Sequence, residues 1–177
     1  LGAETVRVLA ARGATVWMAC RTTSKADAIA EHLRAAQPDA QLHVVALDLA
    51  DLSSVAACAE QMTDAVEGLD LLINNAGIMA IPRRETADGF EMQLGTNHIG
   101  HFALTAHLLP LLHDDARIVT VSSQAHRTGR MAWADVMKTK RYEKWTAYGQ
   151  SKLANLLFHF ELDRRLRAHG ASQRSVA

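Results

Sequence analysis

The sequence lacks any long hydrophobic run. Its longest apolar stretches are far shorter than the ~20 residues that a helix needs to cross a bilayer, so no membrane-spanning segment is expected. An excess of charge of one sign is also missing, because 19 Lys and Arg residues balance 19 Asp and Glu residues. A chain of zero net charge offers no general attraction for nucleic acid or another polyanion, and we expect no nucleic-acid partner.

Cysteine is scarce, with only Cys20 and Cys58 in 177 residues. Neither has the spacing of metal ligands, and both fall in segments with the pattern of buried strand or helix. Reduced, packed thiols are typical of a reducing compartment, so a cytoplasmic protein is expected. His98, His101 and His107 follow a helical spacing, but no Cys or carboxylate cluster accompanies them, and no metal site is predicted.

Short apolar runs alternate with helical patterns along the whole chain. Strands are predicted over residues 15–20, 42–47, 69–74, 117–122 and from 174 onward. Helices are predicted over residues 4–12, 24–36, from 51 or 53 to 66, from a capping box at 88–91 through 98, and from 146 to 167. Apolar strands separated by helices predict a parallel sheet covered on both faces. We therefore expect one α/β domain over residues 1–177, with a doubly wound, Rossmann-like sheet.

The unusual residues fall at the ends of the predicted strands, where such folds bind ligands. The first strand ends in Arg21, which suits a ribose 2′-phosphate, or else is a solvated surface residue. The second ends in Asp48 and Leu49, where the carboxylate either accepts a hydrogen bond from an adenine or caps the next helix. The third ends in Asn74-Asn75-Ala76-Gly77. Its small residues allow the backbone to approach a ligand, although an ordinary turn is the alternative.

Tyr148 and Lys152 carry the strongest chemical signal. If their segment is helical, they project from one face, one turn apart. A free phenol ionises only near pH ~10. An ammonium roughly 5 Å away stabilises the phenolate by about 3 kcal/mol at an effective dielectric constant near ~20, which suits proton transfer at neutral pH. The alternative is a tyrosine and a lysine on a solvated helix, because this spacing is common.

Two more polar residues are candidates for the same site. Ser123 follows the fourth predicted strand, where its hydroxyl could hold a carbonyl oxygen beside Tyr148, or could belong to a serine-rich turn. Asn97 lies inside a predicted helix, a position that asparagine does not favour. Its side chain is expected to hold a water or bend the helix, unless it simply faces solvent.

Taken together, these residues resemble the short-chain dehydrogenase/reductase family over essentially the whole chain. The resemblance rests on N-N-A-G at 74–77, the helical Asn97, the S-S strand end at 122–123 and Y-x-x-x-K at 148–152, in the family's order. Residues 86–91, 97–102 and 151–155 are similar to the retinol dehydrogenase-like branch of that family. Members of this branch have a long segment between the serine and the tyrosine, as this chain does.

The resemblance implies a role for each residue. Ser123 polarises the substrate oxygen, Tyr148 is the general acid/base, and Lys152 assists Tyr148 and binds the nicotinamide ribose. Asn97 supports the proton relay, and Arg21 selects NADP over NAD. The cofactor-binding residues that the resemblance implies are Gly2, Arg21, Asp48, Leu49, Asn75, Ala76, Gly77, Tyr148 and Lys152.

The chain also departs from the family at both ends. Family members begin with a strand and a glycine-rich loop that binds the pyrophosphate, whereas here Gly2 matches the last glycine of that loop. The sequence stops within the predicted strand at 174–177, before the family's substrate-binding lobe. We therefore expect these 177 residues to be part of a longer protein, and to be inactive and unstable alone.

The expected function is NADP-dependent interconversion of an alcohol and a carbonyl on a small apolar molecule. A double-bond reductase with the same serine, tyrosine and lysine is the alternative enzyme. A non-catalytic dinucleotide-binding sensor is the alternative outside the enzymes, although a sensor has no need of all three residues. A homo-oligomer is also compatible with the sequence. The apolar stripe Leu153, Leu156, Leu157 and Phe160 is interpreted as core rather than interface.

Overall fold

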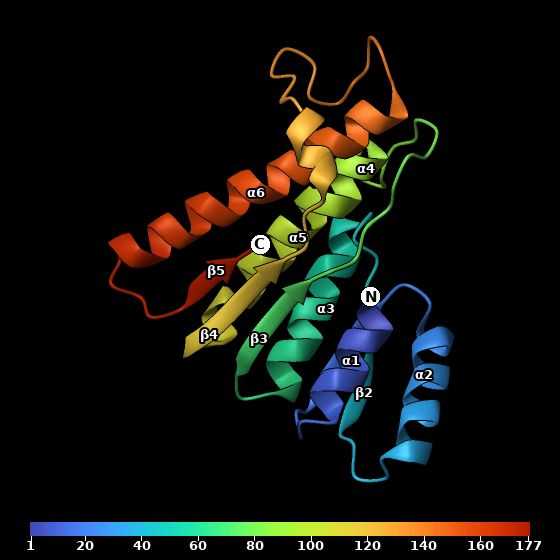
Figure 1. Cartoon of the computed structure of the whole chain (residues 1–177), viewed down its shortest axis with the longest axis vertical. Coiled ribbons are helices and arrows are strands. Elements are labelled where there is room, and N and C mark those ends of the chain that lie inside the picture. The colour runs from blue at the N-terminus through green and yellow to red at the C-terminus, as the bar shows by residue number, and fades with distance from the viewer. The chain divides into compact units, whose positions relative to one another are not determined.

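The structure is a computed structural model that describes residues 1–177. Helices alternate with strands, and every strand pair is parallel (Figure 1). The α/β class is therefore confirmed. The chain divides into two compact units, Leu1–Asp48 and Leu49–Ala177, called unit 1 and unit 2 below. The prediction of a single domain stays a prediction.

Unit 1 is a two-stranded parallel sheet with two helices. Its elements are α1 (Gly2–Ala10), β1 (Val16–Cys20), α2 (Thr23–Ala36) and β2 (Leu42–Ala46). The strands pair in register from Val16 opposite Leu42 to Cys20 opposite Ala46, so both end at the same edge. The helix α1 runs back along β1, which places its amino end at that edge as well (Figure 1). A small apolar core joins the helices to the strands, formed by Ala10, Met18, Ala26, Ala30, Leu33 and Leu42.

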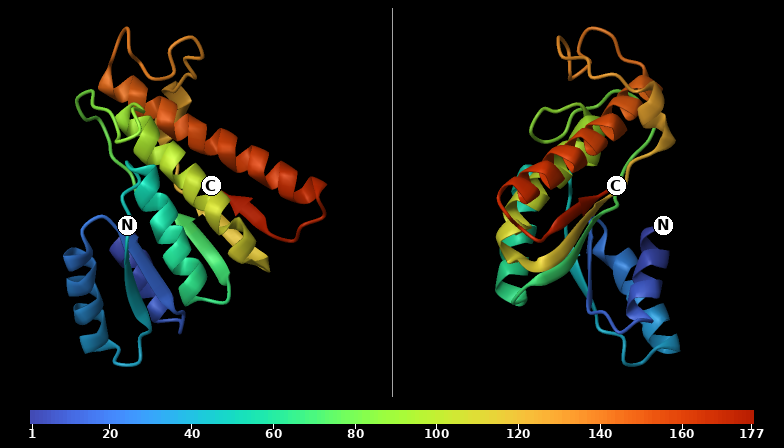
Figure 2. Two further views of the ribbon diagram at one scale, coloured as in Figure 1. Left: turned by 180° about the vertical axis from the view of Figure 1, so that it is seen from behind. Right: turned by 60° about the vertical axis from the view of Figure 1, so that its left-hand side comes forward.

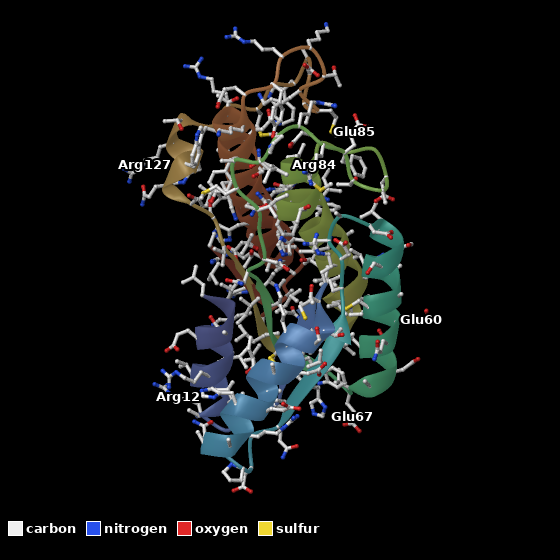
Figure 3. The ribbon with its side chains drawn as sticks, turned by 90° about the vertical axis from the view of Figure 1, so that its right-hand side faces the viewer. Arg12, Glu60, Glu67, Arg84, Glu85 and Arg127 are labelled. Carbon is white, nitrogen blue, oxygen red and sulfur yellow. The ribbon has the colours of Figure 1, made fainter.

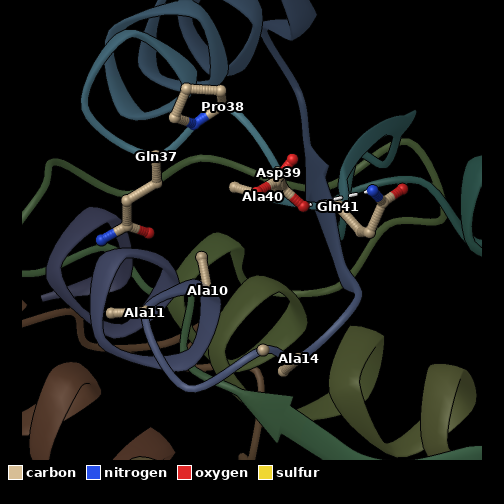
Figure 4. Close-up of a pocket in the computed structure, with 9 residues that line it drawn as sticks. Ala10, Ala11, Ala14, Gln37, Pro38, Asp39, Ala40 and Gln41 are labelled. Carbon is tan, nitrogen blue, oxygen red and sulfur yellow. Dashed lines mark hydrogen bonds between the residues drawn. The ribbon is translucent and has the colours of Figure 1, made fainter.

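A surface hollow of about 360 Å³ lies in unit 1 between the end of α1 and the turn that precedes β2 (Figure 4). Its lining comes from Ala10, Ala11, Gly13 and Ala14 and from residues 37–41. Those segments precede the two strands, so the hollow is at the amino ends of β1 and β2. Ligands of parallel α/β sheets bind at the opposite edge, and the hollow is therefore not a candidate for the cofactor site.

Unit 2 contains a three-stranded parallel sheet in the order β3-β4-β5. Its strands are β3 (Leu69–Asn74), β4 (Leu112–Thr120) and β5 (Arg174–Val176). Its main helices are α3 (Leu52–Ala65), α5 (Gly100–Leu108) and α6 (Lys144–Ala168), which cover one face of the sheet (Figure 2). The shorter elements are α4 (Met92–Leu94), the π-helical turn η1 (Gly95–Ile99) and the 3₁₀ turns η2 (Leu109–Leu111) and η3 (Gln124–Thr128).

The helix caps of unit 2 correct one prediction and settle another. Glu91, not Asp88, caps α4, because its carboxylate accepts the N–H groups of Gln93 at 3.0 Å and Leu94 at 2.8 Å. Asp88 instead accepts the N–H of Leu52, the first residue of α3, at 3.0 Å. The predicted capping box is therefore wrong, and this helix begins at Met92. Asp51 is the cap of α3, as one of the two predicted alternatives had it.

Two predictions about side-chain environments have different outcomes. The interpretation of the α6 stripe as core is wrong for Leu157 and Phe160, of which 45% and 65% is exposed. Both cysteines are free thiols, Cys58 buried and Cys20 half-buried. Charged side chains such as Glu60 and Arg127 point outward from unit 2 (Figure 3). No helix combines the length and the apolar character that a bilayer crossing requires.

We expect residues 1–177 expressed alone to show no single cooperative unfolding transition and no NADPH binding. The strands β1 and β3 each have a sheet edge without a partner, which exposes main-chain N–H and C=O groups. Unit 1 is also too small to bury much apolar surface. Because the net stability of a folded protein is typically only about 5–15 kcal/mol, a modest loss of burial is enough to unfold it. Thermal circular dichroism and NADPH fluorescence titration test this. A cooperative monomer with micromolar affinity for NADPH would contradict it.

Candidate active site

Asn97 joins three segments of unit 2. It is fully buried in the π-helical turn η1, between α4 and α5. Its Oδ1 accepts the N–H of Ile78 at 2.8 Å, and its Nδ2 donates to the Ile78 carbonyl at 2.9 Å and to Ser151 Oγ on α6 at 2.9 Å. The helix departs from α-helical geometry at this residue, and the side chain does not face solvent. Single π turns of this kind are frequent at functional sites.

Tyr148 and Lys152 lie one turn apart on α6, as the spacing predicts. The Lys152 Nζ is 5.9 Å from the centre of the Tyr148 ring, and it donates to the carbonyl of Val121, just beyond β4, at 2.9 Å. Only 4% of Lys152 is exposed, and this burial lowers the pKa of its ammonium. The reading of this pair as a solvated helix face is therefore wrong for the lysine.

The serine pair connects β4 to α6. The strand ends at Thr120, earlier than predicted, so both serines lie in the following loop. Ser122 Oγ donates to the carbonyl of Lys152 at 2.9 Å. Ser123 caps the 3₁₀ turn η3, because its Oγ accepts the N–H of Ala125 at 3.2 Å. This turn packs against the start of α6, where a Cβ added to Gly149 would lie 2.9 Å from the Ala125 carbonyl.

The loop after β3 reaches the same group of residues. Asn74 Nδ2 donates to the hydroxyl of Thr105 on α5 at 3.0 Å and to that of Thr120 on β4 at 3.5 Å, so it links β3 to both elements. A Cβ added to Gly77 would lie 3.2 Å from Asn97 Oδ1 and 3.4 Å from Lys152 Nζ. Gly77 and the neighbouring Ala76 are exposed. The loop therefore brings bare backbone against Asn97 and Lys152.

The remaining candidates lie mainly in unit 1. Arg21 directly follows β1 and is exposed, and Asp48 comes two residues after β2 and is half-buried. Gly2 is the first residue of α1, so all three lie at the carboxyl edge of the unit 1 sheet. Leu49 belongs to unit 2, where it is buried and a Cβ added to Gly100 of α5 would overlap its carbonyl.

Two histidines lie beside Asn97, His98 in η1 and His101 in α5. His101 Nδ1 is 3.0 Å from the carbonyl of Asn97, which fixes the ring proton on that nitrogen. Burial lowers the pKa of His101 to about 4. His98 Nδ1 is 3.3 Å from Asn155 Oδ1, and burial lowers the pKa of His98 as well. No three His, Cys, Asp or Glu side chains are grouped to hold a metal ion.

Two buried polar residues of this network, Gln93 and Gln150, did not stand out in the sequence. Ser151 and Asn155, which belong to the 151–155 motif, are buried as well. A signal for them exists in the sequence, because the buried stretch of α6 from Ala147 to Asn155 has few apolar residues. A helix that packs through polar side chains needs specific hydrogen-bond partners. This pattern therefore marks a helix whose buried face is held by specific hydrogen bonds.

The chain was compared with known proteins and structures. The family model described as short chain dehydrogenase matches residues 1–177. Human retinol dehydrogenase 12 is 46% identical over 178 residues, which cover 99% of this chain and 56% of that protein. The chain belongs to the short-chain dehydrogenase/reductase family. It spans about half the length of the curated relatives it matches.

Solved structures agree with this assignment. The crystal structure of an uncharacterised protein from Mycobacterium paratuberculosis is 55% identical, with a TM-score of 0.89, and the match covers 98% of this chain and 61% of that one. A metagenomic short-chain oxidoreductase in complex with NADP is 22% identical, with a TM-score of 0.77 and coverage of 99% and 75%. The second likeness shows the fold alone. The predicted Rossmann-like class is thereby confirmed.

We expect the protein to lose stability as the pH falls from about 6.5 to about 4, in part through His101. The folded state holds this ring neutral down to a pKa of about 4, whereas an unfolded histidine binds its proton near pH ~6.5. The unfolded state therefore binds more protons in this window, and the loss amounts to about 3 kcal/mol.

Urea unfolding of the protein expressed from its complete reading frame, at pH 7 and at pH 4.5, checks this expectation. His101→Asn should reduce the difference in the free energy of unfolding between the two pH values. His107→Asn should leave that difference unchanged, because His107 is exposed on the same helix. Equal pH dependence in wild type and His101→Asn would contradict the assignment.

Proposed function

We propose that the protein is an NADP-dependent oxidoreductase that interconverts an alcohol and a carbonyl on a small apolar molecule. The observation that supports this most directly is the environment of Lys152. Its ammonium is buried, lies 5.9 Å from the ring of Tyr148, and is close to the bare backbone of Gly77. A positive charge held in this way beside a tyrosine suits proton transfer at neutral pH.

The residues around Lys152 fit a nicotinamide nucleotide. Ala76 and Gly77 are exposed and have no side chain beyond a methyl group, so a flat ring and its ribose can approach the main chain. When bound, NADP supplies or accepts the hydride at the substrate carbon. The residues that we propose to bind NADP are Gly2, Arg21, Asp48, Leu49, Asn75, Ala76, Gly77, Tyr148 and Lys152.

The proposal assigns a role to each of the four catalytic residues. Tyr148 transfers the proton to or from the substrate oxygen, and the Lys152 ammonium stabilises the phenolate that forms. The Ser123 hydroxyl donates a hydrogen bond to the same oxygen. Asn97 supports the proton relay, and it also holds the loop of Ile78 against α6 through its three hydrogen bonds.

The relatives support the choice of substrate and cofactor. Retinol is a long apolar alcohol, and proteins named retinol dehydrogenase are 40–46% identical to this chain. A protein that shares the fold was solved in complex with NADP. In this chain Arg21 stands at the end of β1, and a guanidinium matches the geometry of a ribose 2′-phosphate. We therefore propose NADP rather than NAD.

Tyr148→Phe, made in the protein expressed from its complete reading frame, should lower kcat at least about a hundredfold. The change removes the hydroxyl that transfers the proton, and general acid–base groups contribute about 10²–10⁴-fold. NADPH affinity should stay near that of wild type. Steady-state turnover on a panel of apolar alcohols and aldehydes, with product identification, measures this. Near-normal turnover would remove Tyr148 from the mechanism, and reduction of a carbon–carbon double bond alone would identify a double-bond reductase instead.

Arg21→Ala should lose most of the preference for NADP over NAD. A charge-assisted contact between a guanidinium and a phosphate contributes about 1.5–3 kcal/mol, or roughly tenfold to 150-fold in Kd. Titration of NADPH and NADH against wild type and variant, both expressed from the complete reading frame, decides this. Arg12→Ala is the matched control, because Arg12 is also exposed in unit 1 but lies at the opposite edge, between α1 and β1. Equal affinities for both cofactors in wild type would contradict the proposal.

A further inference from the structure

The segment of residues 129–143, called the belt below, connects η3 to α6. It begins where η3 ends at Gly129 and stops at Glu143, the cap of α6. The belt contains no helix or strand. In Figures 1 and 2 it is the orange loop that arches beside the first turns of α6. A segment without regular main-chain hydrogen bonds needs other contacts to fix its position. Two buried glutamine side chains provide such contacts for the belt.

Gln150 is the first anchor. It has no exposed surface. Its Oε1 accepts the N–H of Ala132 at 3.1 Å, and its Nε2 donates to the carbonyl of Val136 at 2.7 Å. Gln150 comes two residues after Tyr148, which is about 200° around the helix. It therefore holds the belt against the side of α6 that faces away from Tyr148 and Lys152.

Gln93 is the second anchor, at the far end of the belt. This side chain is also fully buried. Its Nε2 donates to the hydroxyl of Tyr142 at 2.8 Å and to the carbonyl of Lys144 at 2.9 Å. Gln93 is part of α4, which leads directly into the π turn of Asn97. The belt thereby links the element that contains Asn97 to the beginning of α6.

A contact of bare backbone completes the arrangement at η3. A Cβ added to Gly129 would overlap the carbonyl of Gly149. The backbone after η3 and the backbone of α6 therefore touch there with no side chain between them. Gly149 is the neighbour of Tyr148, and the cap at the other end of η3 is Ser123. The distance between η3 and α6 therefore sets the distance between the Ser123 hydroxyl and Tyr148.

We propose that Gln150 is a positioning residue, which holds the belt so that η3 keeps Ser123 at its working distance from Tyr148. The proposal rests on the proposed function, because it assigns Ser123 and Tyr148 to one reaction. Ala132 is only three residues beyond Gly129, so loss of its hydrogen bond to Gln150 frees the end of η3. Tyr148 and Lys152 share one helix, and their mutual geometry does not depend on the belt.

Gln150→Met, in the protein expressed from its complete reading frame, tests the proposal. Methionine has a similar volume but cannot make either hydrogen bond. We expect kcat to fall about 10- to 100-fold, since a misplacement on the order of 1 Å at a reacting group costs about a hundredfold. KM for NADPH and the pH midpoint of kcat should not change, because Lys152 stays in place. Gln61→Met is the control, because Gln61 is exposed on α3.

A double-mutant cycle with Ser123→Ala separates positioning from general damage. If Gln150 acts through Ser123, Gln150→Met should cost less than about threefold in the Ser123→Ala background, because interacting residues are not additive. Losses that multiply, or a shifted pH midpoint, would overturn the proposal. Gly149→Ala is the second variant should Gln150→Met not fold. Its Cβ displaces η3 without leaving polar atoms unpaired, and the same non-additivity is expected.

Hydrogen exchange tests whether Gln150 holds the belt and η3 without a measurement of turnover. Gln150→Met should speed amide exchange at Ala132 and also throughout η3, whereas Gln61→Met should change neither. Faster exchange at Ala132 alone would show that the belt does not hold η3, and the inference would then be wrong. If the exchange result is as expected but wild type turns over no alcohol or carbonyl, the proposed function fails instead.

Discussion

The buried amide of Asn97 is the interaction on which the arrangement of unit 2 depends. A fully buried asparagine must satisfy its hydrogen-bonding groups or destabilise the fold. Here it does so through both main-chain groups of Ile78 and the hydroxyl of Ser151. These partners come from a loop and from α6, so neither element can move without the loss of a buried hydrogen bond. The bare backbone of Gly77 and the ammonium of Lys152 are held together as a result.

Hydrogen bonds to main chain, rather than ion pairs, hold the rest of the site. Lys152 donates to the carbonyl of Val121, and Ser122 donates to the carbonyl of Lys152. The ion pairs of α6 lie instead on its outer surface, where Glu161 binds Arg164 and Arg165 at 2.7 Å each. Such exposed pairs contribute little to stability. The charge of Lys152 is therefore not neutralised by a carboxylate partner, which leaves it available to a phenolate.

The existence of the strands, and the site residues that follow them, could be predicted from the sequence because both are local. The bounds of β4 could not, since it spans Leu112–Thr120 rather than residues 117–122. The prediction of β3 matches Leu69–Asn74 at both ends, and Tyr148 and Lys152 share one helix as expected. The cap of α4 could not be predicted, because Asp88 and Glu91 both suit a helix start. Which of the two caps the helix depends on Leu52, which is distant in sequence. Its N–H donates to the Asp88 carboxylate, so Asp88 does not cap α4. The roles of Gln93 and Gln150 were missed for the same reason, since their partners belong to an irregular segment.

The π turn at Gly95–Ile99 has a consequence for how this region tolerates changes of length. A π turn contains one residue more than the α-helical turn it replaces. Because the wide turn takes up that extra residue within one rotation, deletion of a single residue there would restore a regular helix and leave the faces of α4 and α5 nearly unchanged. A deletion elsewhere in α4 or α5 would instead rotate the residues beyond it by about 100°. The deletion at the turn would still remove the local widening at Asn97, whose amide binds both Ile78 and Ser151. The buried amide, rather than the direction of the two helices, therefore accounts for the length of this turn.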